Sequence, residues 1–350
     1  MKTKHFKLLG CAALSIVCAI ASHAQSVSST PVGYVTYTVN ANSDLKLGIP
    51  MEQASSFIGS VGSVAAGTID AGAAVGDLTS SSHYIKLTSG SLSGQWYQVT
   101  GATGNTITVA EDLAAAGVAN GDTFQVTPFW TMDSLLSSGG GVPGSPDIFN
   151  ATALVLTFDP SAIGTNLSTS ASYLYYTGSL APEGWYDSSA LTPAGTVVIN
   201  PDTFIQIRNT TGDSVDIIVS GTVPSSGVSL PVVSRSSQQQ DNLVYNPYPT
   251  SVTLGTSNLY ESGAVAGSPD IFNPTDLVLV YPSNQSGLNS ATSASYLYYT
   301  GSLAPEGWYD SSALSPAGDI AIEEGAPIII RKAAGSDSTT TWSSDLPYTL

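Results

Sequence analysis

The sequence predicts an all-β protein made of two duplicated β-sandwich-like units, with a small β-barrel or meander inserted in the first. Three observations support this. Apolar and polar residues alternate in short runs such as Tyr34–Val39, Val215–Val219 and Ile320–Ile322, and a period of two is typical of half-buried strands. Turn-forming residues separate these runs about every 8–12 positions, and no segment keeps a helical period. A long segment also occurs twice.

The repeat has a fixed offset of 123 residues and needs no gap. Thr169–Leu191 recurs letter for letter as Thr292–Leu314, and Gly144–Asn150 recurs as Gly267–Asn273. In the flanking predicted strands only the class of residue is kept, which is all that packing demands. We therefore divide the chain into a first β-unit (25–53 and 126–223) and a second β-unit (224–350).

The first β-unit contains residues that the second lacks. Two weak echoes, of Ile49-Pro50 with Leu230-Pro231 and of Thr127–Thr131 with Asn246–Thr250, differ in offset and so leave residues 54–125 without a counterpart. Within them, short β-branched and aromatic runs are separated by Gly-containing turns, which predicts hairpins. A segment of this size fits a small inserted domain.

The first 24 residues have the pattern of a signal peptide. Three lysines precede the apolar run Leu8–Ile20, and Ala21-Ser22-His23-Ala24 supplies the small residues of a cleavage site. A retained anchor helix and a lipoprotein box ending at Cys11 are the alternatives. All three place the chain outside the cytoplasm, in the periplasm, on the outer surface or outside the cell. No later stretch has the length and apolar character of a membrane span.

Composition restricts the chemistry of the remaining chain. Both cysteines lie in the first 24 residues, and His83 is the only histidine after them. Thiol catalysis and Cys-based metal sites are therefore excluded, and a multi-histidine zinc site cannot form. The same residues contain 6 Lys+Arg and 26 Asp+Glu. This acidic balance repels phosphate backbones and argues against nucleic-acid binding.

The exact repeat contains the candidate ligand-binding residues, which combine aromatic rings with carboxylates: Tyr176, Glu183, Trp185, Tyr186 and Asp187, with their copies Tyr299, Glu306, Trp308, Tyr309 and Asp310. Such a combination suits a sugar-binding surface. The interpretation that we favour is structural, with the tyrosines on a strand and the tryptophan as a core anchor across a hairpin. Glu183 and Asp187 as a glycosidase pair is a further hypothesis.

Calcium is the ligand that the acidic turns favour, although no D-x-D-x-D-G loop is present. The candidates are Asp147 with Asn150, their copies Asp270 and Asn273, and the run Asp213–Asp216. Ordinary turn formation is the simpler interpretation of these residues. Arg208 and Arg331, at equivalent places in the repeat, are expected to close an ion pair within each unit. His83 is expected at the surface or in a turn.

Several segments together resemble an uncharacterised family of exported bacterial proteins known mainly from the Verrucomicrobia. The matching segments cover nearly all of the chain after residue 24: Gly33–Val39, Tyr84–Gly94, Trp96–Val99, Gly121–Val126, Phe129–Thr131, the tyrosine-rich runs before Gly178 and Gly301, and Ile328–Lys332. The connection Thr177–Gly184 is longer than the Asn-Gly hairpin expected there. The resemblance implies export and all-β architecture, and it brings no established activity.

These observations support three hypotheses of function. The first is a non-enzymatic structural or assembly protein of the cell surface or extracellular matrix, whose strand edges pair between chains or with envelope components. The second is a glycan-binding protein made bivalent by its two aromatic hairpins, with polysaccharide as its partner. The third is a glycosidase or esterase.

Overall fold

The computed structural model describes residues 30–350 except 77, 79–81 and 283. Residues Pro31–Leu350 form one compact unit. The predicted all-β class is confirmed: the described strands form six antiparallel sheets, and helix is limited to single turns. No described helix has the length and apolar character to span a membrane. The predicted signal peptide lies outside the described residues.

The first β-unit has two layers. A five-stranded sheet has the order β12-β11-β10-β13-β2, and a two-stranded ribbon pairs β1 with β14. The ribbon's Val39 and Val219 and the sheet's Ile207 and Trp185 belong to one buried cluster, so the ribbon packs on the sheet. The bounds are β1 Val32–Val39, β2 Ser43–Leu47, β10 Ala153–Phe158, β11 Thr169–Tyr176, β12 Gly184–Asp187, β13 Ile205–Asn209 and β14 Val215–Thr222.

The second β-unit has a sheet with the corresponding order, β20-β19-β18-β22-β16, and a ribbon of β15 and β23. A short bridge of β17 with β21 completes it, and its own buried cluster includes Trp308 and Trp342. The bounds are β15 Val228–Ser234, β16 Gln240–Tyr245, β17 Val252–Thr253, β18 Leu277–Val280, β19 Ala294–Tyr299, β20 Gly307–Asp310, β21 Ala321–Ile322, β22 Pro327–Lys332 and β23 Ser338–Ser344.

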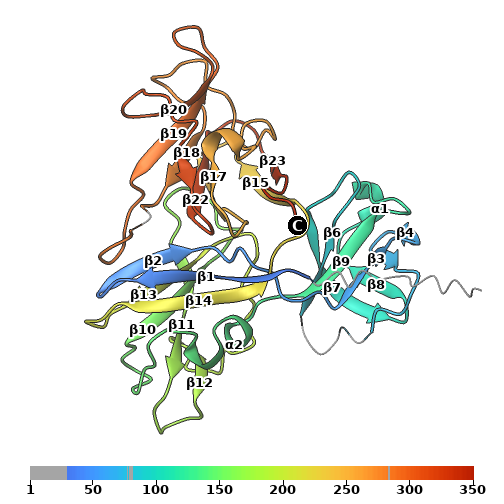
Figure 1. The fold of residues 1–350 in the computed structure, drawn as a ribbon, viewed down its shortest axis with the longest axis vertical. Coiled ribbons are helices and arrows are strands. Elements are labelled where there is room, and N and C mark those ends of the chain that lie inside the picture. The colour runs from blue at the N-terminus through green and yellow to red at the C-terminus, as the bar shows by residue number, and fades with distance from the viewer. Residues whose placement is uncertain (1–29, 77, 79–81, 283) are drawn as a thin grey trace, which may run out of the picture. The chain divides into compact units, whose positions relative to one another are not determined.

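The inserted residues form a seven-stranded sheet of order β3-β9-β6-β7-β8-β5-β4, drawn in blue to teal in Figure 1. Its described edge strands β3 and β4 do not pair with each other, so the sheet stays open around its own core. It extends to Pro128, just beyond the expected limit at 125. The bounds are β3 Phe57–Ser60, β4 Ser63–Ala65, β5 Thr68–Asp70, β6 His83–Leu87, β7 Trp96–Thr103, β8 Thr106–Val109 and β9 Thr123–Pro128.

The remaining elements are short helical turns. These are α1 Leu113–Ala116 in the insert, α2 Met132–Leu135 and η1 Ser137–Gly139 in the first β-unit, and η2 Leu254–Thr256 in the second. Thr131 caps α2 by accepting a hydrogen bond from the amide of Ser134 at 3.2 Å, which satisfies a donor that the helix itself leaves free.

Strand register corrects the weak echo between Ile49-Pro50 and Leu230-Pro231. β15 pairs with β23 as β1 pairs with β14, so β15 corresponds to Val32–Val39 instead. Thr36 lies opposite Ile218 and Pro231 lies opposite Thr341, and these two partners are separated by the repeat offset. Thr36 and Pro231 therefore occupy equivalent positions.

The loop that follows β10 in the first β-unit contacts the second β-unit, and the loop that follows β18 in the second contacts the first. The predicted ion pairs are confirmed, because Arg208 binds Asp44 and Arg331 binds Asp241, each at 2.7 Å within its own unit. The amide of Asn289 donates to Asp44 at 2.6 Å and that of Asn166 donates to Asp241 at 2.7 Å, both across the two units. The two loops therefore dock reciprocally on the opposite Arg–Asp pair.

This docking also closes the edges of the five-stranded sheets. The amides of Asp44 in β2 and Asp241 in β16 donate to Gly287 and Gly164 of the opposite loops at 3.0 and 2.9 Å. At the other edges, the carbonyl of Trp185 accepts a hydrogen bond from the amide of Ala194, just after the first hairpin. The carbonyl of Trp308 accepts one from Ala317 in the second copy, and both distances are 2.8 Å. Covered edges do not offer a template for pairing with another chain.

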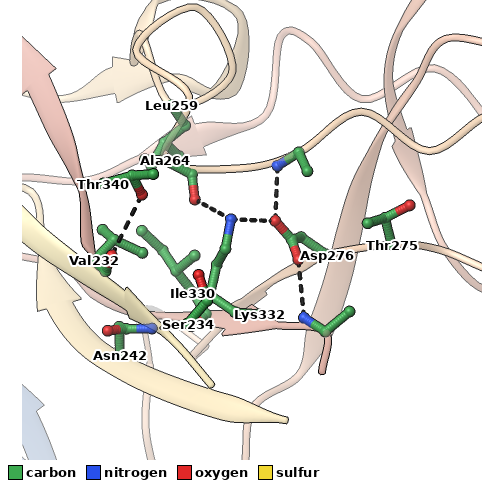
Figure 2. A network of polar contacts seen from close by, with 12 residues as sticks. Val232, Ser234, Asn242, Leu259, Ala264, Thr275, Asp276, Ile330, Lys332 and Thr340 are labelled. Carbon is green, nitrogen blue, oxygen red and sulfur yellow. Dashed lines mark hydrogen bonds and ion pairs between the residues drawn. The ribbon is translucent and has the colours of Figure 1, made fainter. Parts of the chain in front are cut away.

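The second β-unit contains a buried ion pair that the first lacks (Figure 2). The ammonium of Lys332 in β22 donates to the carboxylate of Asp276 and to the carbonyl of Ala264, the latter at 3.0 Å. Asp276 also accepts from the amides of Ala266 and Ala333 at 2.7 and 2.9 Å. At the equivalent places, 123 residues earlier, the first β-unit has Asn209 and Ala153.

Candidate functional site

The aromatic rings of the two exact hairpins lie in the cores of the β-units. Tyr175 and Trp185 face each other across β11 and β12 with ring centroids 5.5 Å apart. The indole nitrogen of Trp185 donates to the carbonyl of Leu136 at 3.1 Å. All six predicted aromatic site residues are buried: Tyr176, Trp185, Tyr186, Tyr299, Trp308 and Tyr309. Their faces contact protein, in agreement with the structural interpretation that the sequence favoured.

The hairpin carboxylates have local partners. Glu183 accepts a hydrogen bond from the hydroxyl of Tyr175 at 2.8 Å, and Glu306 accepts one from Tyr298 at 3.4 Å. Burial, followed by this bond to Glu183, raises the pKa of Tyr175. Asp187 accepts from the amides of Ser189 and Ala190, and Asp310 does the same in the second copy. These aspartates stabilise the turns that follow them.

The two aspartate–asparagine pairs considered for calcium also form turns. Asp147 accepts from the amide of Phe149 at 2.9 Å and from the side chain of Asn150 at 2.6 Å, and Asp270 does the same with Phe272 and Asn273. In both copies the asparagine first, and then the amide, lowers the pKa of the aspartate. In the run Asp213–Asp216, Asp216 lies in strand β14 instead of a turn, and its carboxylate accepts a hydrogen bond from the hydroxyl of Thr38 at 2.7 Å. The described residues contain no group of three His, Cys, Asp or Glu side chains placed to hold a metal ion.

His83 corrects a sequence-based expectation. It begins β6 and is buried, with its Nε2 atom 3.2 Å from the hydroxyl of Ser56. Every residue of β6 is buried, because neighbouring strands flank it and both of its faces are covered. The expectation of a surface or turn position was therefore wrong.

Apolar side chains exposed beside the exact hairpins were not recognised in the sequence. Phe149 and Leu180 are 70% and 75% exposed, and their copies Phe272 and Leu303 are 67% and 74% exposed. The buried hydroxyl of Tyr176 accepts a hydrogen bond from the amide of Leu180 at 2.7 Å, which fixes the loop. Each β-unit thus exposes one phenylalanine and one leucine at these positions. Exposure is not encoded in residue type, so the pattern of the loop alone did not indicate it.

Strand β1 is an open edge among the described strands. It is eight residues long and has neither a charge nor a proline. β14 is the only described strand that pairs with it, and β1 and β14 run side by side as the long blue and yellow arrows of Figure 1. Val32 and Tyr34 are 78% and 72% exposed, and Ile218 of β14 is also exposed. A long, uncharged edge strand with unpaired backbone groups is a template for pairing with another chain.

The equivalent strand β15 has a closed edge. The amide of Ser229 donates to Gly94 of the insert at 3.2 Å. The side chain of Asn242 accepts from the amide of Val233 at 2.7 Å and donates to its carbonyl at 3.0 Å. Because backbone groups alternate in direction along a strand, Pro231 lies on the same edge and lacks a donor there. At the position of Thr36, β15 therefore has a residue that prevents pairing.

A small cavity lies where the insert and both β-units meet. It has a volume of about 70 Å³ and is lined in part by Trp96, Tyr245 and the ion-paired Glu52 and Lys86. Asp202, also in its wall, accepts from the indole of Trp96 at 2.6 Å, and burial raises the pKa of Asp202 to about 6. No local sequence pattern indicated this cavity, because the residues that line it come from distant segments.

Comparisons with known proteins give no identification. No family model, no curated protein and no solved structure matches the chain.

Proposed function

We propose that the protein is an exported, non-enzymatic structural protein of the cell surface or extracellular matrix, and that its chains assemble by pairing at the edge of β1. The open edge of β1 is the observation that carries this proposal. The edges of both five-stranded sheets and of β15 are covered within the chain. Compared with these closed edges, β1 is an uncharged eight-residue strand without proline and is suited to pairing with another chain.

The geometry favours a second copy of the same chain as the partner. Antiparallel pairing of β1 with β1 is self-complementary, as a two-fold interface requires, and would join two ribbons into a four-stranded sheet. Each hydrogen bond contributes about 0.5–1.5 kcal/mol, whereas association costs about 4–15 kcal/mol. We therefore expect concentration-dependent self-association, with the exposed Tyr34 and Ile218 adding apolar contact. The exposed Phe149, Leu180 and their copies offer further apolar contacts through which pairs extend.

The test is the solution mass of residues 25–350, measured by light scattering over a range of concentrations. We expect species larger than one chain, and we expect the Thr36→Pro variant to remain a monomer. The proline removes a donor on the open edge, and the same residue is tolerated at the equivalent Pro231. Thr36→Val is the matched control, because it keeps the donor and should assemble.

Circular dichroism of the three proteins verifies that each is folded. A wild-type chain that stays monomeric throughout, or a folded Thr36→Pro variant that assembles like the wild type, would overturn the proposal.

The glycan-binding alternative receives no support from the hairpins, because the rings that would stack on a sugar are buried. An enzymatic function receives none from Glu183 and Asp187, whose carboxylates hydrogen-bond to a tyrosine and to turn amides.

A further inference from the structure

A second cavity lies between the two β-units, away from β1. It has a volume of about 470 Å³, which is within the range of small-ligand sites. Strands of both five-stranded sheets line it, and the two reciprocal loops contribute Asn166–Thr169 and Asn289–Thr292. Most of its wall comes in equivalent pairs, such as Leu156 with Leu279 and Phe158 with Tyr281.

Positive charge is concentrated in this cavity. Lys46, Arg208 and Arg331 are three of the six lysine and arginine residues that follow residue 24. No aspartate or glutamate is among the lining residues, although acidic residues are far more numerous in the chain. Arg208 and Arg331 are ion-paired with Asp44 and Asp241, which leaves Lys46 as the lining cation outside any ion pair of the described residues. An unpaired cation attracts an anion.

Lys46 is the central cation because its ammonium has unused hydrogen-bond donors. It is 7% exposed, and its ammonium donates to the carbonyl of Ser290 at 3.0 Å and lies 4.5 Å from the ring centroid of Tyr281. None of the ion pairs among the described residues includes Lys46. An ammonium has three donors, and a buried charge is costly without a partner.

The two arginines add unused donors at the cavity wall. In the described structure Arg208 and Arg331 each bond through Nε and Nη2, to an aspartate and to the asparagine of the opposite loop. Their Nη1 groups take no part in these contacts. A guanidinium held in this fixed position is well suited to bind a carboxylate.

The two sides of the cavity differ in polarity at two pairs of equivalent positions. Lys46 lies opposite Gln206 in the first sheet, whereas Leu243 lies opposite Ile329 in the second. One side therefore offers a cation and an amide, and the other offers two aliphatic side chains beside Phe158 and Tyr281. A ligand that satisfies both sides has an anionic end and an apolar body.

We propose that this cavity binds a small organic carboxylate, with the carboxylate on Lys46 and the apolar portion against Leu243 and Ile329. The ligand bridges the two β-units and neutralises the buried ammonium. This site is independent of β1 and of the assembly proposed above.

The test is isothermal titration calorimetry of residues 25–350 with hexanoate. Hexanol, which keeps the apolar body without the charge, and acetate, which keeps the charge without the body, are the comparison probes. We expect hexanoate to bind and both comparison probes to bind at least about tenfold more weakly, since a charge-assisted hydrogen bond and buried methylenes each contribute on this scale.

The decisive variant is Lys46→Leu, which places in the first unit the residue that the second has at Leu243. We expect it to fold and to bind hexanoate about 10- to 100-fold more weakly. Arg235→Gln removes a cation that does not line the cavity and should leave binding unchanged. Absence of hexanoate binding at millimolar concentration would overturn the proposal. So would equal binding by Lys46→Leu, or a matching loss in Arg235→Gln.

Discussion

Replacing Lys332 by methionine leaves the carboxylate of Asp276 buried without its cation. Asp276 is 2% exposed, and after the change it keeps only the amide donors of Ala266 and Ala333. Breaking a buried pair by removing one partner costs about 3–5 kcal/mol. Because two donors still satisfy the carboxylate, we expect Lys332→Met near the lower end, at about 3 kcal/mol. Asp276→Asn leaves an ammonium with the carbonyl of Ala264, and we expect a cost near the upper end.

The first β-unit supplies the control for this prediction. The double variant Lys332→Asn with Asp276→Ala reproduces the pair formed there by Asn209 and Ala153. It buries no charge, so we expect it to be more stable than either of its own component variants, Lys332→Asn and Asp276→Ala, with a coupling energy of about 0.5–3 kcal/mol.

Native-state hydrogen exchange of the β22 amides measures the free energy of opening at the site of the change. Circular dichroism verifies that each variant is folded. Single variants that cost less than about 1 kcal/mol would refute the reasoning from charge burial. A double variant as unstable as the sum of its component variants Lys332→Asn and Asp276→Ala would refute it too.

Two further predictions concern the junction cavity and the hairpin tryptophans. The pKa of Asp202 is raised to about 6 by burial, so the folded state holds this proton more tightly than the unfolded chain. The stability that the carboxyl contributes is present below about pH 4 and is lost as pH rises to about 6. Asp202→Asn should therefore stabilise the protein at pH 7 by at most about 2–3 kcal/mol and by little at pH 4. Urea titrations of the variant and the wild type at the two pH values measure this difference. An equal change in stability at pH 4 and pH 7 would contradict the prediction. Trp185→Phe loses the hydrogen bond to the carbonyl of Leu136, whereas the indole nitrogen of Trp308 has no hydrogen-bond partner. Trp185→Phe should therefore lower the free energy of unfolding by about 1 kcal/mol more than Trp308→Phe, measured in the same urea titration.

The strands were predictable where their residues alternate and difficult where they do not. Val32–Val39 alternates, and the structure shows a ribbon strand with one buried face. The short strand β6 is buried throughout, so His83 and Lys86 carry polar groups that a periodic pattern assigns to the surface. Lys86 is paired with Glu52, which comes from a segment outside β6, and no local pattern indicates such a partner.

Long-range pairing accounts for most of what the sequence could not indicate. β1 pairs with β14, more than 170 residues later, instead of with β2, which follows after a short turn. Arg208 was correctly expected in an ion pair, but its contact with Asn289 depends on a loop of the other β-unit. The cavity that the two loops enclose follows from this docking, and so it could not be predicted from either copy alone.

The differences between the two copies are more informative about function than their identities. The two identical hairpins place their aromatic rings in the cores of the β-units, where the same residues fill equivalent packing positions. The open edge of β1 has Thr36 where the closed edge of β15 has Pro231. The polar side of the cavity has Lys46 where the apolar side has Leu243. Packing does not require either difference, because each copy tolerates its own residue in the same backbone register. Exchanging residues between equivalent positions therefore changes one chemical property while preserving the fold, which is why Thr36→Pro and Lys46→Leu are the variants that separate function from stability.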